Sequence, residues 1–114
     1  MSAFRSICPA SRLPVDRGVA ALVDGEQVAV FRTADGDLHA VSNHDPFSGA
    51  MVLSRGIVGS RGDRSTVASP VYKQVFDLAT GECVDDPEVR LAVHEVRVRN
   101  GMVEVALLTR ALSA

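Results

Sequence analysis

The feature that most constrains the fold of this chain is a two-residue alternation of apolar and polar side chains, interrupted by short turns. The clearest case is near the C-terminus, where Asn100-Gly101 joins two alternating segments, residues 92–99 and 102–108. Asn-Gly accepts the positive φ angles of a type I′ turn, so this pattern predicts a β-hairpin. The residues predicted to share one face of its second strand are Val103, Val105 and Leu107.

The same turn signal occurs twice in the first half of the chain. Asp24-Gly25 and Asp35-Gly36 separate apolar or alternating segments at residues 19–23, 27–33 and 38–42. Asp-Gly between such segments is a strong short-range hairpin signal. We therefore expect a three-stranded antiparallel meander over residues 19–42.

The rest of the chain contains shorter segments. The pieces expected to be brief strands are residues 51–53, 56–58, 66–69 and 74–78. Residues 60–65 are expected to form a polar turn or mobile loop, residues 85–87 a bend, and Leu107–Leu112 a short helical or frayed tail. Many short strands with regular turns predict an all-β domain, an antiparallel sandwich or barrel, occupying residues 1–114 as one unit.

Composition excludes several classes of function. The 114 residues carry a net charge of −2, 4% aromatic residues and no Trp, which argues against a nucleic-acid-binding surface. The apolar runs are far shorter than a membrane span. Residues 1–10 lack the apolar core of a secretory signal. We therefore expect a cytoplasmic protein.

Three histidines are the first candidates for chemistry. His39 and His94 lie in predicted strands, and we interpret both as structural. His44 lies in a loop beside an aspartate and could act as a general base, but no nucleophile motif accompanies it. Loop structure or surface contact is therefore the favoured role for His44.

The two cysteines, Cys8 and Cys83, are far apart in sequence and form no Cys-x-x-Cys pair. In a reducing compartment they are expected to be free thiols, and a disulfide between them is the alternative. Neither the cysteines nor the histidines have the close spacing of zinc or iron–sulfur ligands.

Two proline-containing loops lie in the middle of the chain. The first reads AVSNHDPFSG from Ala40, and the second reads SPVYKQVFDLATG from Ser69. This frame resembles the Rieske iron–sulfur domain, in which the loops read Cys-Pro-His and Cys-Pro-x-His and the second continues into Phe-Asp-x-x-Thr-Gly. The resemblance spans nearly the whole chain and implies a Rieske-like fold with an inserted two-loop subdomain at about residues 43–82.

The resemblance also locates the four cluster ligands, and all four are replaced here. They fall on Asp45, Phe47, Ser69 and Tyr72. A Rieske centre requires two thiolates and two imidazoles, whereas Asp and Ser are hard oxygen donors and Phe is no ligand. We therefore expect no cluster and no catalytic, metal-binding or cofactor-binding residue. Instead, Asp45, Ser69 and Tyr72 are expected to join the loops by hydrogen bonds, and Phe47 to fill the vacated volume.

The stretches NHDPFSGAMVLSRGIVG and SPVYKQVFDLATGEC are similar to one family in particular, the small subunit of the cytoplasmic, assimilatory NAD(P)H-dependent nitrite reductase. That resemblance implies a large partner subunit carrying FAD, an iron–sulfur cluster and sirohaem, which reduces nitrite to ammonium. The small chain would support or modulate this enzyme without performing its chemistry, because hydride and multi-electron transfer require cofactors.

Two alternatives stay open. One is an electron-carrying Rieske-type ferredoxin, against which the four replaced ligands argue. The other is a β-domain adaptor of another oxidoreductase, which only the identity of the partner distinguishes. The candidates for a surface that faces the partner lie at the two loops, and they are His44, Pro46, Pro70 and Lys73. The alternative is that these residues only close the fold.

Overall fold

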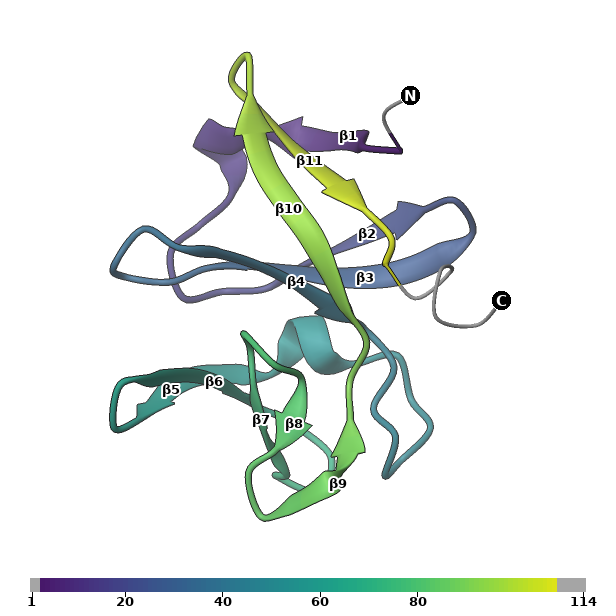
Figure 1. Ribbon diagram of the computed structural model, residues 1–114, viewed down its shortest axis with the longest axis vertical. Helices are drawn as coiled ribbons and strands as arrows, with labels where there is room; N and C mark the ends of the chain where they lie inside the picture. The colour runs from purple at the N-terminus through teal and green to yellow at the C-terminus, as the bar shows by residue number, and fades with distance from the viewer. Residues whose placement is uncertain (1–2, 109–114) are drawn as a thin grey trace.

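The computed structural model describes residues 3–108, which form two antiparallel sheets stacked end to end (Figure 1). The first sheet has the order β1 (Arg5–Pro9), β11 (Met102–Ala106), β10 (Val93–Arg99), β4 (Leu38–Ser42), β3 (Glu26–Arg32) and β2 (Val19–Val23). The second has the order β5 (Ile57–Arg61), β6 (Arg64–Ala68), β7 (Val75–Asp77), β8 (Glu82–Cys83) and β9 (Asp86–Arg90). The all-β prediction is confirmed.

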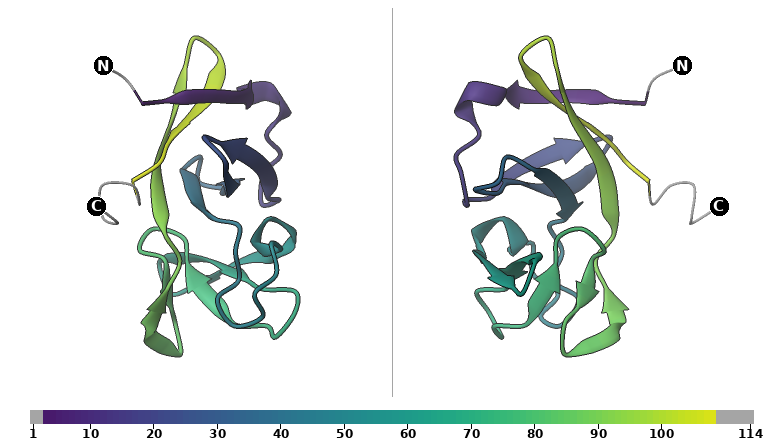
Figure 2. Two further views of the ribbon diagram at one scale, coloured as in Figure 1. Left: turned by 90° about the vertical axis from the view of Figure 1, so that its right-hand side faces the viewer. Right: turned by 60° about the vertical axis from the view of Figure 1, so that its left-hand side comes forward.

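The six-stranded sheet curls until its edge strands β1 and β2 approach each other, so it forms a nearly closed barrel (Figure 2). Two short 3₁₀ turns, η1 (Ala10–Arg12) and η2 (Leu53–Arg55), complete the regular structure. Over residues 3–108, no helix has the length and apolar character needed to cross a membrane.

The predicted hairpins are present, and two have the expected turn geometry. Asp24 and Gly25 have φ angles of 48° and 85°, and Asn100 and Gly101 have 52° and 76°, the left-handed values that a type I′ turn needs. The third connection is longer than expected. It spans residues 33–37, where the Thr33 N–H donates to the Asp37 carbonyl at 3.0 Å.

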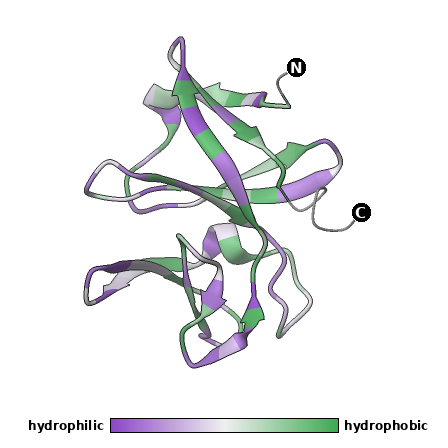
Figure 3. Cartoon of the chain, in the orientation of Figure 1, coloured by the Kyte–Doolittle hydropathy of each residue, from purple (hydrophilic) through white to green (hydrophobic). Residues whose placement is uncertain are grey.

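Strand β3 is buried on both faces, which explains its continuous apolar run. Val28 and Val30 pack inside the barrel, whereas Ala29 and Phe31 face a second core between the barrel and the smaller sheet. Other members of this second core are Val41, Leu53, Val67, Phe76, Leu78, Cys83 and Leu91. In contrast, β10 alternates between hydrophobic and hydrophilic residues (Figure 3), and His94 is its only buried residue.

Several local predictions are wrong. Residues 51–53 form no strand: Met51 makes an isolated bridge to His44, and η2 follows. For residues 60–65 the polar turn is confirmed but the mobile loop is wrong, because β5 and β6 pair as far as Arg61 and Arg64 and leave only a tight turn between them. The expected bend at residues 85–87 gives way to β9, which contains Pro87.

Two boundaries near the ends also differ. β1 was not predicted at all, because its sequence does not alternate clearly. At the other end, β11 ends at Ala106, and Leu107 and Leu108 are not helical. The remainder of the expected helical or frayed tail, residues 109–112, lies outside the described residues.

The smaller sheet is an insertion in the barrel. The chain leaves β4 at residue 43 and returns to β10 after residue 92. The first loop (residues 45–50) and the second loop (residues 69–74) both lie at the end of the molecule remote from the barrel (Figures 1 and 2). We refer to these two loops together as the loop tip.

Candidate functional site

The first loop is closed around Asp45. The Asp45 N–H donates to the Ala50 carbonyl at 2.8 Å, and the Gly49 N–H donates back to the Asp45 carbonyl at 2.7 Å. The Asp45 carboxylate accepts the Phe47 N–H through Oδ1 at 2.9 Å. Gly49 closes the loop with a φ of 80°, a left-handed conformation that glycine adopts without steric cost.

The second loop repeats this arrangement around Ser69. The Ser69 N–H donates to the Gln74 carbonyl at 2.9 Å, and the Lys73 N–H donates to the Ser69 carbonyl at 3.1 Å. The Ser69 hydroxyl accepts the Val71 N–H at 3.2 Å. Lys73 stands at the position of Gly49 and has a φ of 64°. The two loops are therefore structural twins, each organised by one side-chain oxygen.

A buried hydrogen bond joins the two loops. Ser69 Oγ donates to Asp45 Oδ2 at 2.5 Å, and both residues are 0% exposed. Burial raises the pKa of Asp45, but the hydrogen bonds from Ser69 and the Phe47 N–H outweigh it and hold the pKa below its ordinary value. The predicted link between Asp45 and Ser69 is confirmed.

Phe47 contributes to the core beneath the first loop. Its half-buried ring packs against the second core, with the ring centroid 6.1 Å from that of Phe76 and the planes tilted by 47°. Such a tilted pair adds favourable aromatic contact to the burial of apolar surface. Phe47 thus occupies space inside the fold, as expected.

The expectation for Tyr72 is wrong. Its side chain is 63% exposed and makes no hydrogen bond to any residue from 3 to 108. Tyr72 therefore does not join the loops. The physical reason is that backbone hydrogen bonds and the Asp45–Ser69 bond already close and join the two loops. The Tyr72 hydroxyl is therefore not needed as a further link between them.

The four positions do not fit a [2Fe-2S] cluster. Asp45 and Ser69 bond to each other, Phe47 packs against the core and Tyr72 points into solvent. None of these groups is a thiolate or an imidazole, which such a centre requires. Among residues 3–108, no group of three or more His, Cys, Asp or Glu side chains is arranged to hold a metal ion.

Asn43 is a structural residue that the sequence did not reveal. Its side chain is buried. Asn43 Oδ1 accepts a hydrogen bond from the Ser54 N–H at 2.7 Å, and Asn43 Nδ2 donates to the Met51 carbonyl and to Gln27 Oε1, both at 3.2 Å. It therefore ties the start of the first loop to η2 and to the barrel. The sequence signal available was weak, since a polar residue before a loop is ordinarily exposed.

The Phe-Asp-x-x-Thr-Gly segment has a structural role. The Asp77 carboxylate accepts the N–H groups of Ala79 and Thr80 at 2.7 and 3.1 Å, and Arg64 Nε at 2.6 Å. Burial raises the pKa of Asp77, but these donors outweigh it and hold the pKa below its ordinary value. Gly81 follows, with a φ of 81° and the Leu91 backbone packed closely against it.

The histidines do not form a site. His94 is buried, and its Nδ1 accepts the Leu108 N–H at 3.2 Å. His39 is half-buried, and burial lowers the pKa of both imidazoles. His44 is exposed beside the first loop, with its backbone N–H donating to Ser42 Oγ at 3.2 Å.

The cysteines are both free thiols, as expected. Cys8 lies on β1 of the barrel and Cys83 on β8 of the smaller sheet, where it is fully buried. The alternative of a disulfide between them is therefore wrong.

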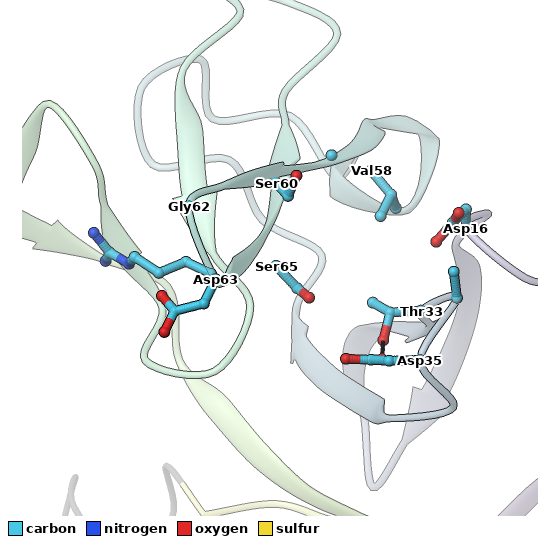
Figure 4. A pocket seen from close by; sticks show the side chains of 11 residues that line it. Asp16, Thr33, Asp35, Val58, Ser60, Gly62, Asp63 and Ser65 are labelled. Atoms are coloured by element: carbon cyan, nitrogen blue, oxygen red, sulfur yellow. Dashed lines mark hydrogen bonds between the residues drawn. The ribbon is translucent and has the colours of Figure 1, made fainter.

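A polar cleft of about 370 Å³ lies between the β5–β6 hairpin and the β3–β4 turn (Figure 4). Its carboxylates are Asp16, Asp35 and Asp63. Asp35 accepts hydrogen bonds from the Thr33 hydroxyl and the Asp37 N–H, which lower its pKa. The contacts among Thr33, Asp35 and Asp37 close the β3–β4 turn, so they have a structural role at the edge of the cleft.

Comparison with known proteins identifies the family. The Rieske-like [2Fe-2S] domain family matches residues 3–106. The "Nitrite reductase (NADH) small subunit" of Salmonella typhimurium is 41% identical over 106 residues, which cover 92% of this chain and 98% of that protein. A Klebsiella oxytoca "Nitrite reductase [NAD(P)H] large subunit" is 38% identical over 111 residues, which cover 95% of this chain but 12% of that one.

Solved structures agree with this assignment. A crystal structure of a Mycobacterium tuberculosis protein, described as an NADH-dependent nitrite reductase small subunit, is 49% identical, with a TM-score of 0.91 over 95% of this chain and 97% of that one. The Escherichia coli protein NirD is 39% identical, with a TM-score of 0.84 over 92% and 96% of the two chains.

The fold is also found in redox proteins that are more distant in sequence. The ferredoxin of a Nocardioides aromaticivorans dioxygenase has a TM-score of 0.79 but is only 23% identical, a similarity that extends to the fold alone. Taken together, the matches over nearly the whole length show that this chain belongs to the family of nitrite reductase small subunits, within the Rieske-like domain family.

Proposed function

We propose that this chain is the non-catalytic small subunit of an NAD(P)H-dependent nitrite reductase in the cytoplasm, where it supports or modulates a large catalytic subunit. The relatives that match it over nearly their full length carry the name of that small subunit. In the Klebsiella protein, a segment similar to almost the whole of this chain is part of a large subunit. A domain that is covalently joined to its partner in one relative is expected to bind the same partner when separate.

One observation carries the non-catalytic part of the proposal. The Asp45–Ser69 hydrogen bond joins the two positions at which the Rieske resemblance places the thiolate ligands. Electron transfer requires a redox group, and these oxygens cannot replace sulfur as ligands of a Rieske centre. The flavin, iron–sulfur cluster and sirohaem that the nitrite reductase resemblance implies would therefore all belong to the large subunit.

The loop tip is the surface that we assign to the large subunit. Pro46 and Lys73 are exposed there, Pro70 is half-buried, and His44 is exposed immediately before the first loop. The Asp45–Ser69 bond fixes the two loops relative to each other, so the surface is formed before binding and loses little conformational entropy on association.

Reconstitution tests this proposal. The purified large subunit of the same organism is assayed for NADH- or NADPH-dependent nitrite consumption with and without this chain, and complex formation is followed by gel filtration. We expect a stable complex with higher or longer-lasting activity, and no activity from this chain alone. A large subunit that neither binds the chain nor changes its activity would contradict the proposal. The His44→Ala/Lys73→Ala double variant should fold normally and bind less well.

A further inference from the structure

We infer that Tyr72 and Lys73 form the recognition element of the loop tip. The Tyr72 ring enters an apolar socket of the large subunit, and the Lys73 ammonium pairs with a carboxylate at the rim of that socket. This inference rests on the proposed function, because it names the contact through which the same partner is bound.

Tyr72 is exposed to an extent that the isolated chain does not explain. It is the only tyrosine in the sequence, it is 63% exposed, and the adjacent Val71 is 43% exposed. Its hydroxyl has no hydrogen-bond partner among residues 3–108. Tyrosine is enriched among the residues that dominate binding energy at protein interfaces, since it combines a large apolar ring with a polar end.

The backbone that presents Tyr72 is held firmly. Bonds from the Ser69 N–H to the Gln74 carbonyl (2.9 Å) and from the Lys73 N–H to the Ser69 carbonyl (3.1 Å) close the loop on both sides of the ring. Ser69 is fixed in turn by Asp45. An exposed aromatic side chain on a pre-organised loop gains contact area at a low entropic cost.

Lys73 has a left-handed backbone conformation, which is unusual for a residue other than glycine, whereas the equivalent residue of the first loop is a glycine. The first loop has Gly49 at this position, with a φ of 80°, whereas the second holds a lysine at 64°. A left-handed conformation is unfavourable for a residue with a Cβ atom, and such strain is concentrated at functional sites. Lys73 is the only lysine in the chain, and its Nζ donates to the Pro70 carbonyl at 3.1 Å, beside Tyr72.

The surroundings favour a specific contact over a general charge attraction. Lys73 is the only charged side chain exposed on the two loops, but two exposed carboxylates follow β8, Asp85 in the β8–β9 turn and Asp86 at the start of β9. The net charge near the tip is therefore mixed. Other strongly exposed apolar residues, Leu22 on β2 and Ile57 on β5, lie on separate edge strands of different sheets. The adjacent Tyr72 and Lys73 are thus the distinctive pair.

Calorimetric titration of the full chain into the purified large subunit tests the role of Tyr72. Tyr72→Ala should weaken binding by roughly thirtyfold, the effect of losing a central interface residue, with an unchanged melting temperature because the ring makes no intramolecular hydrogen bond. Tyr72→Phe should retain most of the affinity. Leu22→Ala, which removes a residue that is 72% exposed on β2, is the matched control and should bind like the wild type.

Lys73→Gly separates binding from folding. Glycine relieves the left-handed strain, so the variant should be at least as stable as the wild type, yet we expect binding several times weaker and less sensitive to salt. Lysine acetylation followed by mass spectrometry gives an independent readout. As the only lysine, Lys73 should be modified in the free chain and protected in the complex.

The outcomes distinguish the two levels of the account. If the wild type binds the large subunit and Tyr72→Ala binds equally well, or if Lys73 stays reactive in the complex, this inference is wrong and the proposed function stands. If the wild type does not bind the large subunit at all, both fail. Loss of affinity in Tyr72→Ala and Lys73→Gly, with Leu22→Ala unaffected, would support both.

Discussion

Asp45→Ala is expected to lower the free energy of unfolding by about 3 kcal/mol, because it removes a buried charged acceptor and leaves one buried and one partly buried donor without partners. Those donors are the Ser69 hydroxyl and the Phe47 N–H. Urea unfolding at neutral pH measures the loss. Asp63→Ala, which removes an exposed carboxylate, is the matched control and should change stability by less than about 0.5 kcal/mol.

The same carboxylate makes stability depend on acid. The hydrogen bonds lower the pKa of Asp45 in the folded chain, so its contribution is fully present above the unfolded value near 3.9 and is lost as the pH falls through the folded value. Stability should therefore fall less steeply below about pH 4 in Asp45→Ala than in the wild type. Two results would show that the twin loops do not depend on this bond. One is an equal loss of stability on acidification in the two proteins, and the other is a free energy of unfolding that Asp45→Ala leaves unchanged.

Gly81→Ala is expected to have a larger effect, a loss of more than about 4 kcal/mol or failure to fold, because two costs combine there. The backbone has a φ of 81°, and an added Cβ would lie 2.2 Å from the Leu91 carbonyl oxygen and 2.9 Å from a Val93 methyl group. The Leu91 N–H also donates to the Gly81 carbonyl at 2.7 Å, so the two segments cannot separate without losing that bond.

Gly25→Ala is the matched control for Gly81→Ala. Gly25 has nearly the same φ, 85°, but no atom lies within 4 Å of an added Cβ. It should therefore show only the left-handed strain, about 1 kcal/mol. Thermal unfolding of both variants separates strain from steric overlap. Similar melting temperatures would mean that the Leu91 backbone moves readily to accept an added methyl group, which would contradict this account of Gly81.

The sequence predicted those parts of the fold whose turns have strong local signals. Asn100-Gly101 and Asp24-Gly25 adopt the conformations that their residue types favour, and the strands on both sides follow. β1 and β9 escaped prediction because they are edge strands held by pairing and not by alternation. Pro87 in β9 is tolerated for the same reason, since an edge strand can spare a donor.

At the candidate site, the residue types that replace the cluster ligands could be predicted from the sequence, whereas the directions of several side chains could not. The sequence itself shows that the thiolates and imidazoles are replaced. It also shows that each twin loop begins with a polar residue followed by proline, Asp45-Pro46 in the first and Ser69-Pro70 in the second. Asp and Ser often accept the N–H two residues ahead, as both do here. The outward direction of Tyr72 and the buried contacts of Asn43 depend on tertiary packing, which no local pattern encodes.

The central claim is that this chain binds a large redox subunit while holding no redox centre of its own. Anaerobic affinity purification of the chain from its own cells, grown on nitrite, tests it directly when the mass and visible spectrum of the eluate are recorded. We expect a large partner with flavin and sirohaem absorbance, and a small chain that is colourless once the two are separated. A small brown chain without a partner would contradict the account.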